Sequence, residues 1–333
     1  MLAVKSVFIG TVLAMAASAS AGQQLQPVAT LKAISGEVTC IGFTSQGQAL
    51  FSGSLDTYIT AWTTDDWKQV TTIEPAQPPK AERGEHQAEF RSLTACATDP
   101  TSDKVLVASG GDSIATYALP SGKQLGNRQL AASSIAVSSD ASVVAVSVGS
   151  KVSVFATSDW KKLATLSVGG TASTLRYAPT RKLLAVAVWR GGVQLWDTKT
   201  QTLVRTLSTD GNSEQMSFSP DGRWLGVAVW GSGQQTRVQV WDVSTGYEVT
   251  RLNGHNSNVW GVAFSPDGKF LVSGDTSGDV RLWKVASWQQ CSQLKASGGQ
   301  QVAISPDGHW LAAGGGTLEI SLWDFRNLVQ SCR

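Results

Sequence analysis

The feature that most constrains the fold of this chain is an internal repeat. Residues 216–242, 262–284 and 302–324 share one pattern. Each segment begins with an apolar run, continues with Ser-Pro-Asp-Gly and ends in an alternating run closed by tryptophan. A more divergent form of the pattern fits the rest of the chain. The closing aromatic residues are Trp62, Tyr117, Phe155, Trp196, Trp241, Trp283 and Trp323.

These seven units recur at intervals of 38 to 55 residues, which is typical of a propeller. Ser-Pro-Asp-Gly favours a tight turn, and the runs beside it are rich in β-branched, aromatic and small residues. A four-stranded sheet cannot bury two apolar faces alone, but sheets standing in a ring bury both. The sequence therefore predicts an all-β, seven-bladed propeller of four-stranded antiparallel blades, forming a single domain over residues 22–333.

The most regular unit carries a resemblance to a known family. It reads Gly254-His255, then residues 259–268, then Ser273-Gly274, and closes at Trp283. This string is similar to that of the WD-repeat propellers, and the resemblance extends over residues 28–324. It implies that a strand near one terminus completes the blade built by the other. We therefore expect residues 28–32, from Val28 to Lys32, to form the outer strand of blade seven and cover its edge.

The resemblance also implies a hydrogen-bond chain of His, Ser or Thr, Asp and Trp in each blade. Its aspartate precedes the closing tryptophan by six residues. In blade one, Asp56 and Ser52 fit relative to Trp62, but Ile34 stands at the histidine position.

Blade six has His255, Ser273 and Trp283, but Ser277 occupies the expected aspartate position. No blade is complete on this spacing, so we expect burial and ladder bonds to hold the blades. The predicted structural repeat residues are Asp56, Trp62, Trp196, Trp241, His255, Ser273, Trp283 and Trp323.

The first 21 residues are typical of a secretory signal peptide. Lys5 precedes an apolar run over residues 6–17, and Ala19-Ser20-Ala21 offers small residues for cleavage after Ala21. A membrane anchor is disfavoured because the run is shorter than the roughly 20 residues that span a bilayer. We expect an exported protein, located in the bacterial periplasm or secreted, without membrane insertion.

Charge and cysteine usage exclude several classes of function. The net charge of +2 gives no electrostatic reason to bind nucleic acid or an anionic membrane surface. The four cysteines lack Cys-x-x-Cys spacing, which argues against zinc and haem attachment. Cys40 and Cys96 are expected to act as small buried groups. A bond between Cys291 and Cys332 is one of the pairings that remain open.

The residue types needed for catalysis are scarce. The three histidines are His86 in a long loop, His255 in a repeat position and His309 in a turn. A catalytic triad needs a histidine fixed beside a nucleophile; His255 could serve, but the resemblance gives it a structural role. The sequence predicts no enzyme activity, no cofactor and no metal.

Most of the 13 tryptophans recur at repeat positions and are predicted to pack. Trp189 and Trp230 differ, because they end the second strands of neighbouring blades. That end belongs to the top face, where the turns between second and third strands and the connections between blades converge. Tryptophan and arginine are common anchors of binding sites, and Arg190 follows Trp189. Alternatively, each indole packs over the gap left by a missing aspartate.

Two long loops, residues 74–91 and 231–237, are also expected on this face. They add His86 and Arg237 to the predicted partner-binding residues Trp189, Arg190 and Trp230. The predicted function is a non-catalytic protein-interaction scaffold in the periplasm, with unidentified protein partners and a monomeric state in isolation. The alternative is a small-ligand or glycan-binding propeller that uses the two indoles, and a propeller enzyme ranks below both.

Overall fold

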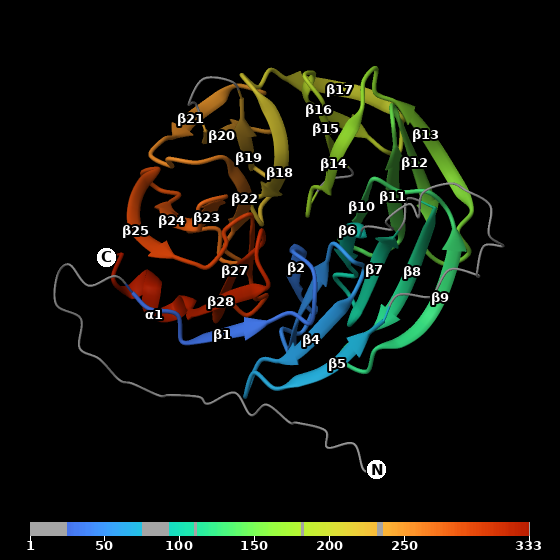
Figure 1. Ribbon diagram of the computed structural model, residues 1–333. Coiled ribbons are helices and arrows are strands. Elements are labelled where there is room, and N and C mark those ends of the chain that lie inside the picture. The colour runs from blue at the N-terminus through green and yellow to red at the C-terminus, as the bar shows by residue number, and fades with distance from the viewer. Residues whose placement is uncertain (1–24, 75–92, 110–111, 181–182, 232–235, 333) are drawn as a thin grey trace, which may run out of the picture.

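The computed structural model describes residues 25–74, 93–109, 112–180, 183–231 and 236–332. Its strands form seven four-stranded antiparallel sheets that stand in a closed ring (Figure 1). The predicted seven-bladed propeller is confirmed. The predicted signal peptide and His86 lie outside the described residues. Within those residues, no helix has both the length and the apolar character to cross a membrane.

Each blade runs from an innermost strand at the axis to an outer strand at the rim. The innermost strands are β2 (Val38–Phe43), β6 (Leu93–Thr98), β10 (Ser134–Val137), β14 (Ala172–Tyr177), β18 (Asn212–Phe218), β22 (Val259–Phe264) and β26 (Gln301–Ile304). The second strands are β3 (Ala49–Ser54), β7 (Lys104–Ser109), β11 (Val143–Val148), β15 (Leu183–Val188), β19 (Trp224–Trp230), β23 (Phe270–Asp275) and β27 (Trp310–Gly314).

The third strands carry the seven closing aromatic residues, as predicted. They are β4 (Ile59–Thr63), β8 (Ser113–Ala118), β12 (Lys151–Ala156), β16 (Gly192–Asp197), β20 (Arg237–Asp242), β24 (Asp279–Lys284) and β28 (Glu319–Asp324). The outer strands are β5 (Gln69–Ile73), β9 (Lys123–Gln129), β13 (Lys162–Ser167), β17 (Thr202–Leu207), β21 (Glu248–Leu252), β25 (Gln289–Lys295) and, in blade seven, β1 (Ala29–Lys32).

The N-terminal strand closes the ring. β1 pairs antiparallel with β28, with Ala29 opposite Leu322 and Lys32 opposite Glu319. The Val28 N–H also donates to the Leu322 carbonyl at 2.7 Å. This confirms the predicted outer strand of blade seven, which covers the ladder edge that β28 would otherwise expose.

The Ser-Pro-Asp-Gly turns explain why the first and second strands meet so regularly. In blade five, the Ser219 hydroxyl donates to Asp221 at 2.5 Å and accepts from the Trp224 N–H at 2.8 Å. Gly222 has φ +70°, a left-handed conformation that glycine adopts without a Cβ clash. The turn thus satisfies its own polar groups and begins the next strand at a fixed residue.

The apolar core lies between neighbouring blades. One cluster joins Ala187 and Leu195 of blade four to Leu225 and Val227 of blade five, all of them fully buried. The second strands are buried on both faces, so their composition is a continuous apolar run. Each blade is therefore stabilised mainly by its two neighbours.

Several tryptophans connect one blade to the next. Trp288 precedes β25 of blade six, and its ring centroid lies 6.0 Å from that of Trp224 in blade five. Trp67 of blade one likewise lies 4.9 Å from Trp310 of blade seven. Both Trp67 and Trp288 have positive φ. The prediction that these periodic tryptophans pack is confirmed.

Blade six contradicts the expectation that no blade has a complete hydrogen-bond chain. His255 Nε2 lies 2.7 Å from Ser273 Oγ, and Trp283 Nε1 donates to the same hydroxyl at 2.9 Å. His255 Nδ1 lies 3.0 Å from Asp275 Oδ2. Asp275, at the end of β23, thus supplies the carboxylate. It lies two residues before Ser277, which is the position that the spacing of six residues had assigned to the aspartate.

The other blades lack this chain in part. In blade one, Ser52 Oγ is buried and has no partner among the described residues, and the Asp56 carboxylate instead accepts from Ser54 at 2.5 Å. In blade five, the buried Trp241 Nε1 likewise has no partner in the described part of the chain. In blade four, Trp196 Nε1 donates to Gln194 at 2.9 Å. Outside blade six, burial and strand pairing therefore provide most of the stabilisation.

Two disulfides use all four cysteines. Cys40 on β2 is bonded to Cys96 on β6, with Cα atoms 6.4 Å apart. The expectation that these two act only as small buried groups is wrong, because the innermost strands of blades one and two converge at the axis. The proposed Cys291–Cys332 pairing is present, with Cα atoms 5.2 Å apart. It fastens the segment after helix α1 (Phe325–Gln330) to blade six.

Candidate functional site

Trp189 and Trp230 lie against each other on the top face, as the sequence predicted. Trp230 ends β19, and Trp189 follows the last residue of β15. Their ring centroids are 5.7 Å apart and the ring planes meet at 61°. Trp189 is 44% exposed, whereas Trp230 is partly buried. The pair thus offers one accessible indole supported from behind by another.

Local hydrogen bonds hold this pair in place. Trp230 Nε1 donates to Glu214 Oε1 on β18 at 2.7 Å. The Trp189 N–H donates to the Thr171 carbonyl at 2.8 Å. Arg190 is exposed and has φ +55°, a conformation uncommon for residues other than glycine. The turn between β15 and β16 therefore presents Trp189 and Arg190 together.

Arg237 lies elsewhere in the blade and has another role. Its side chain is buried, and its Nη2 lies 3.2 Å from Asp210 Oδ2. Arg251 on β21 approaches the same carboxylate oxygen at 2.9 Å. These two arginines fix the connection between β17 and β18 against blade five. The structure places the buried Arg237 side chain inside this ion-pair network, opposite Val229 in the β19–β20 ladder.

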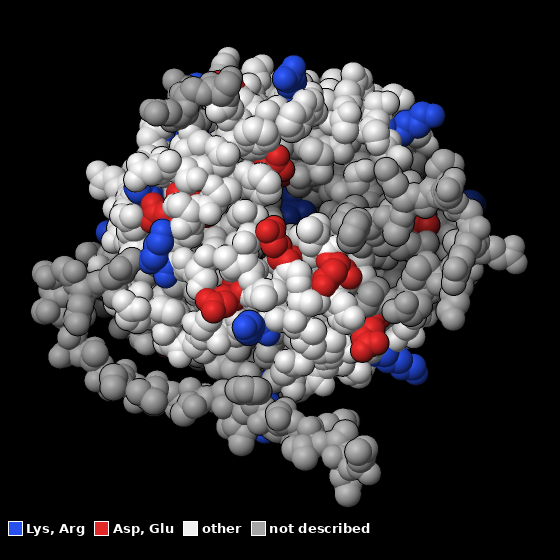
Figure 2. All heavy atoms as spheres, viewed as in Figure 1, with Lys and Arg blue, Asp and Glu red and all other residues white. Residues whose placement is uncertain are grey.

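Charge is unevenly distributed on the face shown in Figure 2. Asp and Glu side chains gather around the middle of that face, whereas most Lys and Arg side chains lie nearer its edge (Figure 2). Phosphate groups are repelled by such a centre, because Coulomb interactions between like charges raise the free energy of association. The pattern gives no support for nucleic-acid binding.

His255 is engaged in the structural chain of blade six. It lies with Asp275 and Asp279 in a buried group whose atom types also suit a cation. Arg281 Nε lies 2.9 Å from Asp279 Oδ2, and both ring nitrogens of His255 already have partners. Burial would raise the pKa of Asp275, but hydrogen bonds from His255, Ser277 and the Asp279 N–H lower it to about 2. These contacts satisfy the group internally.

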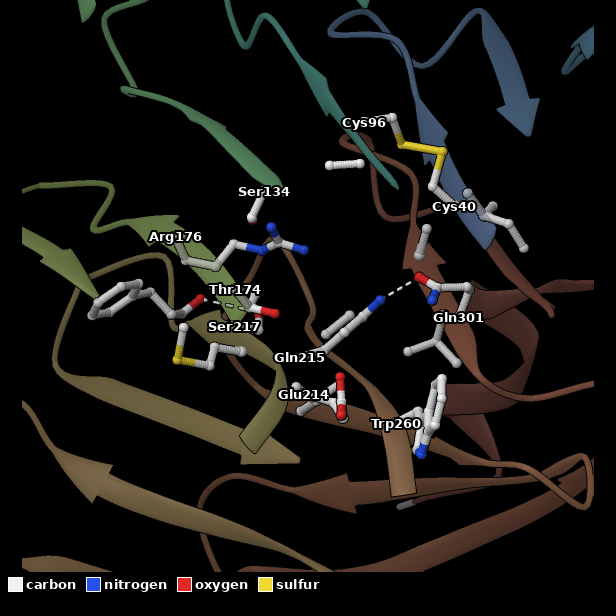
Figure 3. Close-up of a pocket in the computed structure, with 18 of the residues that line it drawn as sticks. Cys40, Cys96, Ser134, Thr174, Arg176, Glu214, Gln215, Ser217, Trp260 and Gln301 are labelled. Atoms are coloured by element: carbon white, nitrogen blue, oxygen red, sulfur yellow. Dashed lines mark hydrogen bonds between the residues drawn. A yellow bond between two sulfur atoms is a disulfide. The ribbon is translucent and has the colours of Figure 1, made fainter. Parts of the chain in front are cut away.

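An axial channel, which the sequence interpretation did not anticipate, opens along the innermost strands. Residues from all seven blades line a cavity of about 590 Å³ (Figure 3). Arg176 on β14 and Glu214 on β18 are its charged lining residues among those described. The sequence contained a weak signal, because Arg176 lies between Leu175 and Tyr177 in an innermost strand. Glu214 connects this channel to Trp230.

A comparison with family models places the repeats. The model of the WD domain, G-beta repeat, matches residues 25–63, 246–284 and 289–324. These ranges include the closing strand β1 and the complete hydrogen-bond chain of blade six. The chain belongs to the WD-repeat β-propeller family. The predicted resemblance is confirmed.

WD-repeat relatives match short stretches of this chain. It is 43% identical over 58 residues to WD repeat-containing protein VIP3 of Arabidopsis thaliana, covering 17% of this chain and 18% of that protein. It is 45% identical over 49 residues to nuclear distribution protein PAC1 of Arthroderma otae, covering 15% and 11%. It is 41% identical over 49 residues to transcription initiation factor TFIID subunit 5 of Caenorhabditis elegans, covering 15% and 8%. The matches thus span less than a fifth of these relatives.

Proposed function

We propose that this WD-repeat protein is a non-catalytic scaffold of the bacterial periplasm that binds a protein partner through its top face. The observation that carries the proposal is the exposed indole of Trp189, which is 44% exposed and rests on Trp230. Arg190 extends from the same turn. Tryptophan and arginine are enriched at the centre of protein interfaces, where truncation of a few residues removes most of the binding energy.

The arrangement of the pair favours a protein partner. Trp230 is held by Glu214, so the support beneath Trp189 is already ordered before binding. Ordering a side chain on association costs about 0.5–1.5 kcal/mol, and a preformed pair avoids part of that cost. Because the ring planes meet at 61°, the two indoles do not form a flat platform on which a sugar chain could stack, and only one indole face is presented. This favours a scaffold over the alternative glycan-binding role.

The described histidines support a non-catalytic role. His255 has hydrogen-bond partners on both ring nitrogens, and the ring of His309 stacks on Trp310 with centroids 4.1 Å apart. A general base must be able to reach the proton that it removes. His255 does lie beside the Ser273 hydroxyl, but both residues are buried and the same hydroxyl accepts a hydrogen bond from Trp283, so a substrate has no access to this pair.

The periplasmic part of the proposal rests on two observations. Residues 1–21 have the pattern of a secretory leader, and the two disulfides use all four cysteines. Disulfides persist mainly in oxidising compartments, which include the bacterial periplasm. Cell fractionation with mass spectrometry of the mature N-terminus tests this part. Cytosolic protein that retains residues 1–21 would contradict it.

The binding face is tested by crosslinking and affinity capture with matched variants. Trp189→Ala removes the exposed indole, and Tyr247→Ala is the control, because Tyr247 is 77% exposed at the turn between β20 and β21. That turn lies at the opposite end of its blade from the turns between second and third strands. We expect Trp189→Ala to reduce capture at least tenfold, a loss of about 1.4 kcal/mol, while Tyr247→Ala leaves it unchanged.

Thermal unfolding separates binding from packing. Because Trp189 is largely exposed, we expect its replacement to leave the melting temperature nearly unchanged. A large loss of stability would show that the indole serves packing. Equal capture by both variants would contradict the proposed face. Quenching of tryptophan fluorescence by an oligosaccharide, abolished in Trp189→Ala, would instead support glycan binding.

A further inference from the structure

The axial channel contains an arginine without an ionic partner. Arg176 points into the channel from β14, and its Nη1 donates at 3.0 Å to the carbonyl of Leu175, its own neighbour in the chain (Figure 3). Arg176 forms no ion pair with any residue that the structure describes. Burial lowers the pKa of this guanidinium below its ordinary value. Arg176 is partly exposed, and the charge of its guanidinium faces the cavity without a protein carboxylate paired to it in the described part of the chain.

The channel also contains a carboxylate without a cation. Glu214 on the adjacent strand β18 lines the same cavity, and its Oε1 accepts a hydrogen bond from Trp230. Glu214 has no ion pair with any described residue. Burial raises the pKa of Glu214, and the Trp230 hydrogen bond acts in the opposite direction. Arg176 and Glu214 therefore share one cavity without neutralising each other.

The cavity that these two groups share is lined by polar and small side chains. Ser217, Ala263 and Ala303 line it, and Gln215 of blade five donates to Gln301 of blade seven within it (Figure 3). Trp260 also lines the cavity, and its buried Nε1 has no acceptor in the part of the chain that the structure describes. An unsatisfied buried donor costs about 1–3 kcal/mol, so the wall of this cavity is not arranged for stability alone.

We propose that the axial channel is a binding site for a small zwitterion, a free amino acid. The ligand's carboxylate pairs with Arg176 and its ammonium group pairs with Glu214. A ligand with both charges compensates both side chains at once. A simple anion would pair with the Arg176 guanidinium but be repelled by the Glu214 carboxylate. A simple cation would pair with Glu214 but be repelled by Arg176. Through the hydrogen bond between Trp230 and Glu214, this site borders the Trp189–Trp230 pair.

Isothermal titration calorimetry on the mature protein tests the proposal. The probes are glycine, β-alanine and γ-aminobutyrate, which carry the same two charges at increasing separation, with acetate and ethylammonium as single-charge controls. We expect at least one amino acid to bind with a dissociation constant below about 1 mM. We expect both single-charge controls to bind at least tenfold more weakly.

Variants assign the binding to the channel. Arg176→Gln and Glu214→Gln should each weaken the best amino acid at least tenfold, and Arg176→Lys should retain part of the affinity because the charge remains. Tyr247→Ala, in the exposed turn between β20 and β21, should leave the affinity unchanged. Calorimetry reports on this site and partner capture reports on the proposed scaffold face, so failure of one is distinguishable from failure of the other.

Three results would overturn the proposal. They are the absence of binding by all three amino acids, equal binding of acetate or ethylammonium, and unchanged affinity in folded Arg176→Gln. If Arg176→Gln does not fold, the comparison of zwitterions with single-charge probes on the wild-type protein decides the question.

Discussion

Replacing Ser273 by alanine gives a sharp test of how blade six is held together. The Ser273 hydroxyl contacts both His255 Nε2, at 2.7 Å, and Trp283 Nε1, at 2.9 Å, and it is fully buried. Alanine removes this oxygen and leaves two buried polar atoms without a partner. Each unsatisfied group costs about 1–3 kcal/mol, so we expect a loss of about 2–6 kcal/mol in the free energy of unfolding.

Blade one provides a matched control at the equivalent strand position. Ser52 pairs with Thr60, two residues before Trp62, just as Ser273 pairs with Arg281, two residues before Trp283. Ser52 Oγ is buried but has no hydrogen-bond partner. Ser52→Ala thus removes a hydroxyl that makes no bond, and we expect a change within about 1 kcal/mol, neutral or stabilising.

Urea unfolding followed by circular dichroism measures both variants. The midpoint for Ser273→Ala should fall clearly below that of the wild type, while the midpoint for Ser52→Ala should remain near it. If the two variants lose the same stability, the loss reflects general burial of a small side chain. The hydrogen-bond chain would then add nothing to the stability of blade six beyond side-chain burial, and its proposed stabilising role would be refuted.

Two further predictions concern closure of the ring and the pH dependence of stability. Deleting residues 22–33 removes β1 together with the buried Leu31, so we expect a loss of at least about 3 kcal/mol or failure to fold; a truncated chain that melts like the wild type would disprove closure by β1. Asp275 has its pKa lowered to about 2, below the value of about 4 for an unfolded aspartate. Its charge therefore stabilises the fold above about pH 4, and this stabilisation is lost as the pH falls toward 2. Asp275→Asn should be less stable than the wild type at pH 7, with a difference that shrinks below pH 4; a difference independent of pH would exclude this role.

The sequence was sufficient to predict the architecture because turn formation and strand packing within each repeat depend on residues close together in the chain. The Ser-Pro-Asp-Gly turns and the closing aromatic residues mark each blade, and the unpaired segment before β2 predicted the closing strand. The neighbouring position of Trp189 and Trp230 also followed from the repeat, because both residues occupy the same place in adjacent blades. Features that depend on position within the repeat were therefore accessible from the sequence.

Features that depend on contacts between repeats were not accessible in the same way. The Cys40–Cys96 bond requires knowing that two innermost strands converge at the axis. Asp275 reaches His255 from the end of β23, a position that the spacing of six residues before the closing tryptophan does not predict. Arg237 was interpreted as part of an exposed loop, but Asp210 in the connection between β17 and β18 pairs with it inside the blade.

The axial channel has the same origin. Arg176 and Glu214 lie on different innermost strands, and only the closed ring places them in one cavity. In the sequence each is a single charge in its own repeat, which does not indicate a shared site. Their relation to each other emerges from the packing of blades four and five.

The most direct test of the proposed scaffold is photocrosslinking in cells that express the exported protein. A benzophenone amino acid is placed at position 189 in one variant and at position 247 in another. We predict a discrete crosslinked protein from position 189 and none from position 247. Identical crosslinking patterns from both positions, or no protein adduct from position 189, would contradict binding through the top face.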